Sequence, residues 1–278
     1  MTNQIEPTAL EALIERQAVK VIDGSWALDG SDMHARFLDE HIPGAQFFDI
    51  EAISDHTTSL PHMAPTPEVF AKAVGRMGIS AGDAVVVYDQ QGLFSAARVW
   101  WTFRLMGHRQ VQVLRGGLPA WKAAGLPVTD VVTTAVPTRY EPDFQNQMVI
   151  DLKGLCKNLN AGGQIVLDAR PHARFTAEAP EPRAGLRGGH IPGSRSLPAS
   201  ELIRDGALKS TEDLRQLFAE RGIRADSRVV TSCGSGVTAA ILSMALDTLG
   251  HPDAVLYDGS WAEWGRETLD TPVATGDS

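Results

Sequence analysis

Cysteine is scarce in this chain of 278 residues. The two cysteines, Cys156 and Cys233, lie far apart in the sequence. Two cysteines cannot form the disulfide framework of a small secreted domain, and no group of Cys and His has the spacing of a zinc site. A reducing compartment is therefore the simplest context, and no metal ion is expected.

Lysine and long apolar stretches are also scarce. Only six of the 25 basic residues are lysine, and the net charge is −9. This acidic balance argues against nucleic acid or an anionic membrane surface as a partner. The longest tight apolar run, residues 84–88, is far too short to span a membrane. Residues 1–17 contain three glutamates and no apolar core of signal-peptide length, so we expect a cytoplasmic protein.

The two halves of the sequence repeat each other. The segment His-Ile-Pro-Gly occurs twice, at 41–44 and 190–193, and four other pairs of segments match in the same order. The offsets of the five pairs are 142 to 149: 21–23 with 166–168, 41–44 with 190–193, 84–89 with 227–232, 107–108 with 250–251, and 116–117 with 258–259. Such a series indicates duplication of one domain, the alternative being a single large α/β domain with recurring turns. The stretch 125–147 has three prolines, several threonines and no helical period. We expect domains at 1–130 and 148–278, with a linker at 131–147.

Strand and helix patterns alternate within each copy. In the second copy we expect strands at 164–168, 228–232 and 254–257, and helices at 211–221 and 237–249. Thr211 is the expected N-cap of the first of these helices. Strands that alternate with helices predict an α/β fold, in which a parallel sheet is covered by helices on both faces.

The loop at 233–238, Cys-Gly-Ser-Gly-Val-Thr, joins an expected strand to an expected helix. Ligands of open α/β sheets bind at this end of the strands. Two glycines allow several backbone N–H groups to face one point, and a helix N-terminus adds partial positive charge. Such a loop favours the thiolate of Cys233, which is the nucleophilic form. The alternative is a buried structural cysteine. At an offset of 143, Gln90 occupies this position in the first copy, which indicates that the sheet does not need a thiol there.

The other cysteine and half of the histidines have structural explanations. Cys156 shares a helical face with Leu152, Leu155 and Leu159, and we expect it in the core. Four histidines occur at paired positions of the two copies, which indicates a structural role: His41, His190, His108 and His251. Four histidines have no such pairing: His34, His56, His62 and His172.

The cysteine loop, the twin His-Ile-Pro-Gly segments and the first copy without a cysteine resemble the two-domain sulfurtransferases of the rhodanese family, from about Val21 to Trp264. The resemblance implies tandem rhodanese-like domains, each a parallel sheet flanked by helices, with the active site between them. It implies that Cys233 carries sulfur as a persulfide. Gly234 and Ser235 stand where thiosulfate-specific members have basic residues, so the loop is similar to that of members using 3-mercaptopyruvate. No metal or organic cofactor is implied.

The resemblance also implies roles for further residues. Two arginines, Arg174 and Arg183, would hold the carboxylate and keto oxygens of 3-mercaptopyruvate. A relay of Ser235, His62 and an acid would handle the thiol proton. The matching acid is Glu51, a position often taken by Asp, and the nearby Asp55 leaves this assignment open. The remaining loop residues would cradle the persulfide: Gly234, Gly236, Val237 and Thr238. The implied sulfur acceptors are a thiol, such as thioredoxin or a small thiol, and cyanide.

Three other functions remain as alternatives. A thiosulfate:cyanide sulfurtransferase would keep the reaction class and change the donor. A cysteine phosphatase would also use a cysteine loop, but it needs an arginine six positions after the cysteine, and that position is Ala239. A non-enzymatic binding module would keep the rhodanese-like domains and leave Cys233 without sulfur.

Overall fold

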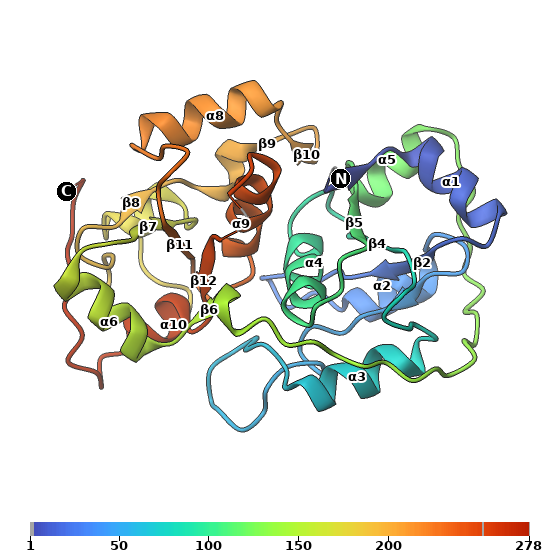
Figure 1. The fold of residues 1–278 in the computed structure, drawn as a ribbon, viewed down its shortest axis with the longest axis horizontal. Helices are drawn as coiled ribbons and strands as arrows, with labels where there is room; N and C mark the ends of the chain where they lie inside the picture. Colours follow the sequence, from blue (N-terminus) through green and yellow to red (C-terminus); the bar gives the residue numbers. More distant parts are fainter. Residues whose placement is uncertain (1–2, 252, 278) are drawn as a thin grey trace. The chain divides into compact units, whose positions relative to one another are not determined.

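The computed structural model describes residues 3–251 and 253–277 of the chain and divides into two compact units (Figure 1). Unit 1 comprises Met1–Asp55, Ala64–Gln145 and Arg204–Leu208, and unit 2 comprises His56–Met63, Asn146–Ile203 and Lys209–Ser278. Most of each unit is one half of the chain, and a short segment of the other half is added to it. The domain limits at 1–130, 131–147 and 148–278 remain a prediction.

Unit 1 contains a five-stranded sheet in the order β1-β5-β4-β2-β3, and every strand pair is parallel. Each strand except β3 is followed directly by a helix that begins within about ten residues, as parallel crossovers require. The elements are β1 (Gln4–Ile5), α1 (Pro7–Glu15), β2 (Lys20–Asp23), α2 (Met33–Asp39), β3 (Gln46–Phe47), α3 (Pro67–Arg76), β4 (Val85–Tyr88), α4 (Ala96–Leu105), β5 (Val111–Leu114) and α5 (Gly117–Ala123).

Unit 2 repeats this plan, with a parallel sheet in the order β6-β12-β11-β7-β8. Its elements are η1 (Asn146–Met148), β6 (Val149–Ile150), α6 (Leu152–Ala161), β7 (Ile165–Asp168), α7 (His172–Phe175), β8 (Arg195–Ser196), η2 (Ala199–Leu202), α8 (Thr211–Glu220), β11 (Val229–Ser232), α9 (Ala239–Thr248), β12 (Val255–Tyr257) and α10 (Ser260–Trp264). Between η2 and α8, β9 (Ile203–Arg204) and β10 (Ala207–Leu208) form a separate two-stranded sheet, of which Arg204–Leu208 belong to unit 1. The predicted class, two α/β units with parallel sheets, is confirmed.

The central strand β11 and the helix α9 of unit 2 both lie in the interior. All four residues of β11 are buried, and eight of the ten residues of α9 are buried. A strand covered on both faces has no exposed side, so even its two polar residues, Thr231 and Ser232, are buried. Among the described residues, no helix combines the length and the apolar character that a membrane crossing needs.

The expected N-cap of helix α8 is wrong by one position. Ser210 has extended backbone angles, and its hydroxyl accepts the N–H of Asp213, so Ser210 is the cap and Thr211 is the first helical residue. Serine and threonine are both good caps, and the sequence places them side by side. The choice between them depends on which of the two is extended, and composition does not show this.

The segment 125–145 has no helix, and it contacts unit 1 along its course (Figure 1). Thr129 forms an isolated antiparallel bridge with His41, and the N–H of Thr138 donates to the carbonyl of Gly75. Further on, the N–H of Gln145 donates to the carbonyl of Leu105. These backbone hydrogen bonds hold the segment against unit 1, so it is an ordered part of that unit over this length.

Candidate active site

Cys233 is the first residue after β11, at the end of the sheet where side chains of parallel strands reach a common edge. The thiol is buried, at 2% exposure, and Ser235 is 5% exposed. Within the described part of the chain, the backbone N–H groups of Gly234, Ser235, Val237 and Thr238 have no hydrogen-bond partner. Buried N–H groups are rarely left in this state. The loop therefore offers four donors to an anion bound beside the thiol.

The equivalent loop of unit 1 shows which residue replaces the cysteine. Ser232 pairs with Asp168, and Tyr88 pairs with Asp23, so these strand ends correspond at an offset of 144. The next residues are Cys233 and Asp89. The assignment of Gln90 to the cysteine position is therefore wrong. The loop of unit 1 has seven residues, 89–95, and that of unit 2 has six, so the offset changes to 143 only within the helices that follow.

Asp89 fills the anion cradle of unit 1 with its own carboxylate. Its Oδ1 accepts the N–H of Gln91, and its Oδ2 accepts those of Phe94, Ser95 and Ala96, all at 2.8 to 2.9 Å. The four donors are thereby paired. The contrast with unit 2 is direct, because there the corresponding loop has donors without an internal acceptor.

Ser235 and His62 lie in hydrogen-bond contact. His62 Nδ1 is 2.9 Å from Ser235 Oγ, and the imidazole is 3% exposed. Both residues belong to unit 2, because the segment His56–Met63 is part of that unit. His62 also adopts a left-handed backbone conformation, with φ of +58°. Such a conformation in a residue other than glycine is held by its surroundings and is frequent at functional sites.

Arg174 and Arg183 both lie against the cysteine loop. A Cβ built on Gly234 would lie 3.3 Å from Arg174 Nη2 and 4.0 Å from Arg183 Nη1. The absence of a side chain at Gly234 thus leaves room for two guanidinium groups at this point of the loop. A guanidinium pair can bind two oxygens of a small anion by charge-assisted hydrogen bonds.

A buried network behind the site fixes Arg174. Glu181 accepts hydrogen bonds from Arg174 through both carboxylate oxygens, and its Oε1 also accepts Nη1 of Arg170 at 2.7 Å. Arg170 bonds Asp168 at 2.6 Å and the carbonyl of Gly189, and its guanidinium stacks over Trp261 at 4.2 Å. The network therefore ties the strand end at Asp168 to the arginine at the loop.

Electrostatics keep this network charged. Burial alone would lower the pKa of Arg170, but the carboxylates of Asp168 and Glu181 more than offset it, and the pKa is raised above its usual value. In unit 1 the residue that corresponds to Asp168 is Asp23, whose carboxylate accepts the backbone N–H of Ser25 and the side-chain amide of Gln90. There burial raises the pKa of the carboxyl to about 6.

Sequence reasoning missed Arg170 and Glu181 as parts of the site. Both lie in the segment that supplied Arg174 and Arg183, and their side chains are 1% and 2% exposed. The available signal was the position of Arg170, two residues after the end of a buried strand. Charged residues are almost never fully buried unless they are paired, so nothing in composition marks this one as internal.

The expected acid of the relay lies in the other unit. Glu51 accepts a hydrogen bond from the indole Nε1 of Trp26 at 2.8 Å, and Trp26 stacks with Phe94. Glu51 and Asp55 both belong to unit 1, whereas His62 belongs to unit 2. The choice between the two carboxylates remains a prediction.

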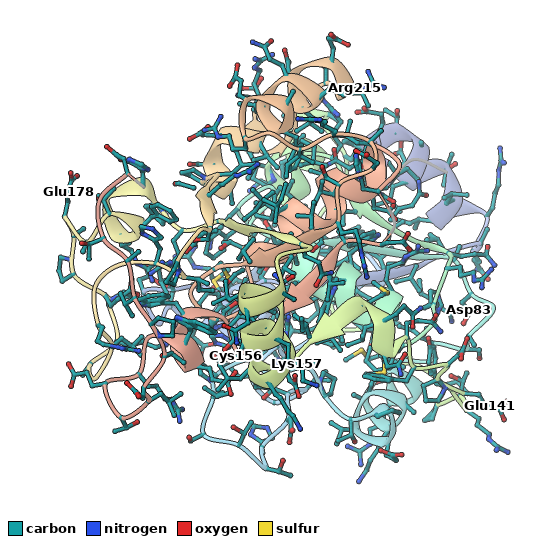
Figure 2. The ribbon with its side chains drawn as sticks, turned by 60° about the vertical axis from the view of Figure 1, so that its left-hand side comes forward. Asp83, Glu141, Cys156, Lys157, Glu178 and Arg215 are labelled. Carbon is teal, nitrogen blue, oxygen red and sulfur yellow. The ribbon has the colours of Figure 1, made fainter. Side chains whose placement is uncertain are left out.

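Cys156 and one pair of histidines, His41 and His190, have the structural surroundings that their sequence patterns indicate. Cys156 is half-buried on α6, where it packs against the core of unit 2 (Figure 2). His41 and His190 occupy matching places, since each stacks on a phenylalanine and bonds the carbonyl of that residue. Within the described residues, no three His, Cys, Asp or Glu side chains are grouped as a metal ion would need.

Both halves of the chain match one known protein family. The family model described as a rhodanese-like domain matches residues 6–124 and 151–267. The chain is 42% identical over 263 residues to 3-mercaptopyruvate sulfurtransferase of Escherichia coli K12, covering 94% of this chain and 93% of the relative. It is 40% identical over 261 residues to the human protein of that name, covering 92% and 88%.

One further relative and one solved structure add to this picture. A mitochondrial protein of Arabidopsis thaliana named thiosulfate/3-mercaptopyruvate sulfurtransferase 1 is 40% identical over 293 residues, covering 97% of this chain and 77% of the relative. The crystal structure of the 3-mercaptopyruvate sulfotransferase SseA of Escherichia coli superimposes with a TM-score of 0.87 and 39% identity, covering 94% of this chain and 99% of that one.

Proposed function

Since this chain belongs to the rhodanese family, with a rhodanese-like domain in each half, we propose that it transfers sulfur from 3-mercaptopyruvate to a thiol or to cyanide and releases pyruvate. The observation that carries the proposal is the loop of unit 2. It places a buried thiol, four backbone donors without partners and two guanidinium groups together. Those are the groups that a sulfur anion and an α-keto carboxylate need.

The first half-reaction forms a persulfide. The Cys233 thiolate attacks the sulfur of 3-mercaptopyruvate, a new S–S bond forms, and the C–S bond of the substrate breaks. The bonding electrons of that C–S bond stay with the carbon fragment, which leaves as the enolate of pyruvate and takes up a proton. Arg174 and Arg183 hold the carboxylate and carbonyl oxygens, so they also stabilise the negative charge that develops on the enolate oxygen.

The second half-reaction returns the enzyme to its starting form. The thiolate of an acceptor, or cyanide, attacks the outer sulfur, and Cys233 leaves as a thiolate. Between the two steps the persulfide lies beside the backbone N–H groups of Gly234, Ser235, Val237 and Thr238, which stabilise its charge. Thioredoxin and small thiols are the proposed acceptors. The two cysteines are unpaired, which fits the reducing conditions of the cytoplasm, the proposed location.

The choice of donor tests the function of the wild-type protein. The loop side chains after Cys233 carry no positive charge, whereas thiosulfate is a compact dianion that favours a cationic loop. We expect kcat/KM for 3-mercaptopyruvate, measured as pyruvate release, to exceed that for thiosulfate, measured as thiocyanate formation, by at least about tenfold, or ~1.4 kcal/mol. A higher value for thiosulfate would favour the thiosulfate:cyanide alternative.

The arginine clamp is tested best at Arg183. Arg174 is bonded to Glu181, so its removal would also leave a buried carboxylate short of partners. We expect Arg183→Ala to lower kcat/KM for 3-mercaptopyruvate about 100-fold, through loss of a charge-assisted contact. Use of thiosulfate should change much less, because it has no carboxylate. Arg139→Ala, at an arginine that is 86% exposed, is the matched control. Equal losses with both donors would remove the clamp role.

The proton relay predicts coupled effects of two substitutions. Ser235 and His62 share one hydrogen bond, and in the proposal they take the thiol proton of the substrate and return it to the enolate carbon. Ser235→Ala and His62→Ala should each lower kcat about 100-fold. The double variant should be little worse than the poorer single one, because both changes break the same path. Multiplicative losses in steady-state pyruvate release would mean that the two residues act separately.

A further inference from the structure

Ser260 combines a strained backbone with complete burial. Its φ is +48°, in the left-handed region, and its exposed fraction is zero. It is the first residue of α10, directly after the turn that follows β12. A left-handed backbone conformation is unfavourable for residues other than glycine, asparagine or aspartate. It persists where contacts of the side chain with the surrounding structure offset its cost.

The hydroxyl of Ser260 makes three hydrogen bonds, which is its full capacity. Its Oγ accepts the backbone N–H of Cys233 and the backbone N–H of Gly236, both at 3.1 Å, and donates to the carbonyl of Tyr257 at 2.8 Å. The backbone of α10 adds two more contacts, because the N–H of Trp261 and that of Ala262 donate to the carbonyls of Cys233 and Gly234. The first residues of α10 therefore hold the cysteine loop in place through hydrogen bonds to Cys233, Gly234 and Gly236.

Unit 1 provides an internal comparison. There the N–H of Leu118 donates to the carbonyl of Asp89, as that of Trp261 does to Cys233, so Gly117 corresponds to Ser260. Gly117 has φ of +56°, almost the same conformation, and is also the first residue of its helix. The left-handed turn is thus common to both units. The half without the cysteine fills it with glycine, and the half with the cysteine fills it with serine despite the strain.

We propose that Ser260 is a positioning residue for the sulfur-transfer loop. Its Oγ takes up the N–H groups of Cys233 and Gly236, which fixes both ends of that turn. The donors left for the thiolate and the persulfide are then those of Gly234, Ser235, Val237 and Thr238. Ser260 does not touch the substrate, and it acts through the geometry of the loop. The inference rests on the proposed role of Cys233.

Two substitutions at Ser260 separate the hydroxyl from the strain. Ser260→Gly removes the hydroxyl and relieves the backbone, and Ser260→Ala removes the hydroxyl and keeps the strain. We expect kcat/KM for 3-mercaptopyruvate to fall by 10- to 100-fold in both variants. The thermal unfolding temperature should fall clearly only in Ser260→Ala. Ser243→Ala, which removes another buried hydroxyl of unit 2, is the matched control and should keep activity within about threefold.

The second readout is the rate at which iodoacetamide alkylates Cys233. This rate is measured at several pH values from the mass of the peptide that contains Cys233. We expect the rate at pH 7 to fall about tenfold in Ser260→Gly and the pH–rate profile to move to higher pH, because the donors no longer converge on the thiolate. Wild-type activity and alkylation rate in Ser260→Gly would overturn the inference and leave the proposed function intact. Alkylation does not depend on sulfur transfer, so this arm tests the loop even if the wild-type protein releases no pyruvate.

Discussion

Replacement of Cys233 by serine is expected to reduce pyruvate release from 3-mercaptopyruvate by at least about 1,000-fold, the scale on which enzymes lose activity with their nucleophile. The hydroxyl of serine fits the same space but is far less acidic than a thiol, so it supplies almost no anion to attack sulfur. The substitution keeps the backbone of the loop and its contacts with α10. The loss should therefore appear in kcat with little change in the unfolding temperature.

Mass spectrometry makes this result specific. After incubation with 3-mercaptopyruvate without acceptor, the wild-type protein should gain the mass of one sulfur atom, and Cys233→Ser should gain none. Cys156→Ser is the matched control, since Cys156 is half-buried on α6 and packs against the core. It should keep both activity and the mass gain. Sulfur on the Cys233→Ser variant, or full activity in it, would contradict the mechanism.

Replacement of Arg170 by methionine is expected to destabilise unit 2 by about 3–5 kcal/mol, the range measured when one partner of a buried ion pair is removed. Asp168 would lose its main partner and Glu181 would lose one of its two arginines, and the two carboxylate side chains are 3% and 2% exposed, so water cannot replace the guanidinium. The contact of the guanidinium with Trp261 would be lost as well. Methionine fills most of the volume, which limits the contribution of a cavity.

The measurement has to report on unit 2 alone, because a chain with two units need not unfold in one step. Hydrogen exchange of the amides of β7, β11 and α9 meets this need. Arg215→Met, at an arginine that is 62% exposed on α8, should change stability by less than about 0.5 kcal/mol. A compensated variant that also carries Asp168→Asn and Glu181→Gln should recover part of the loss. Unchanged exchange in Arg170→Met would show that the network contributes little to the fold.

The repeat predicts the architecture well because it depends on many residues at once. Buried parallel strands and Gly-terminated helices leave periodic patterns, and each pattern occurs twice, so the two α/β units follow from the sequence. Predictions that depend on a single position are less reliable. Thr211 and Ser210 are equally good caps, and only backbone angles distinguish them. The pairing of Gln90 with Cys233 fails because a constant offset does not hold across a loop that differs by one residue between the copies.

The residues of the candidate site also fall into two groups, those that the sequence predicts and those that it does not. Cys233 follows from its loop motif, the two arginines beside Gly234 follow only from the resemblance to the rhodanese family, and the structure brings the three residues together within unit 2. Arg170, Glu181 and Ser260 do not follow, because their importance lies in burial and in hydrogen bonds to distant segments. A sequence shows that an arginine or a serine is present. It does not show that either is buried.

The carboxylate of Asp89 determines which of the two equivalent loops can bind an anionic substrate. A protein with two competent anion loops would divide a scarce anionic metabolite between a productive loop and an idle one, and much of it would be bound without reacting. In unit 1 the donors are already paired with the carboxylate of Asp89, which belongs to the same loop and does not diffuse away. Among the described residues, duplication has therefore left two similar loops, of which that of unit 1 is closed to an anion and that of unit 2 keeps its donors for one.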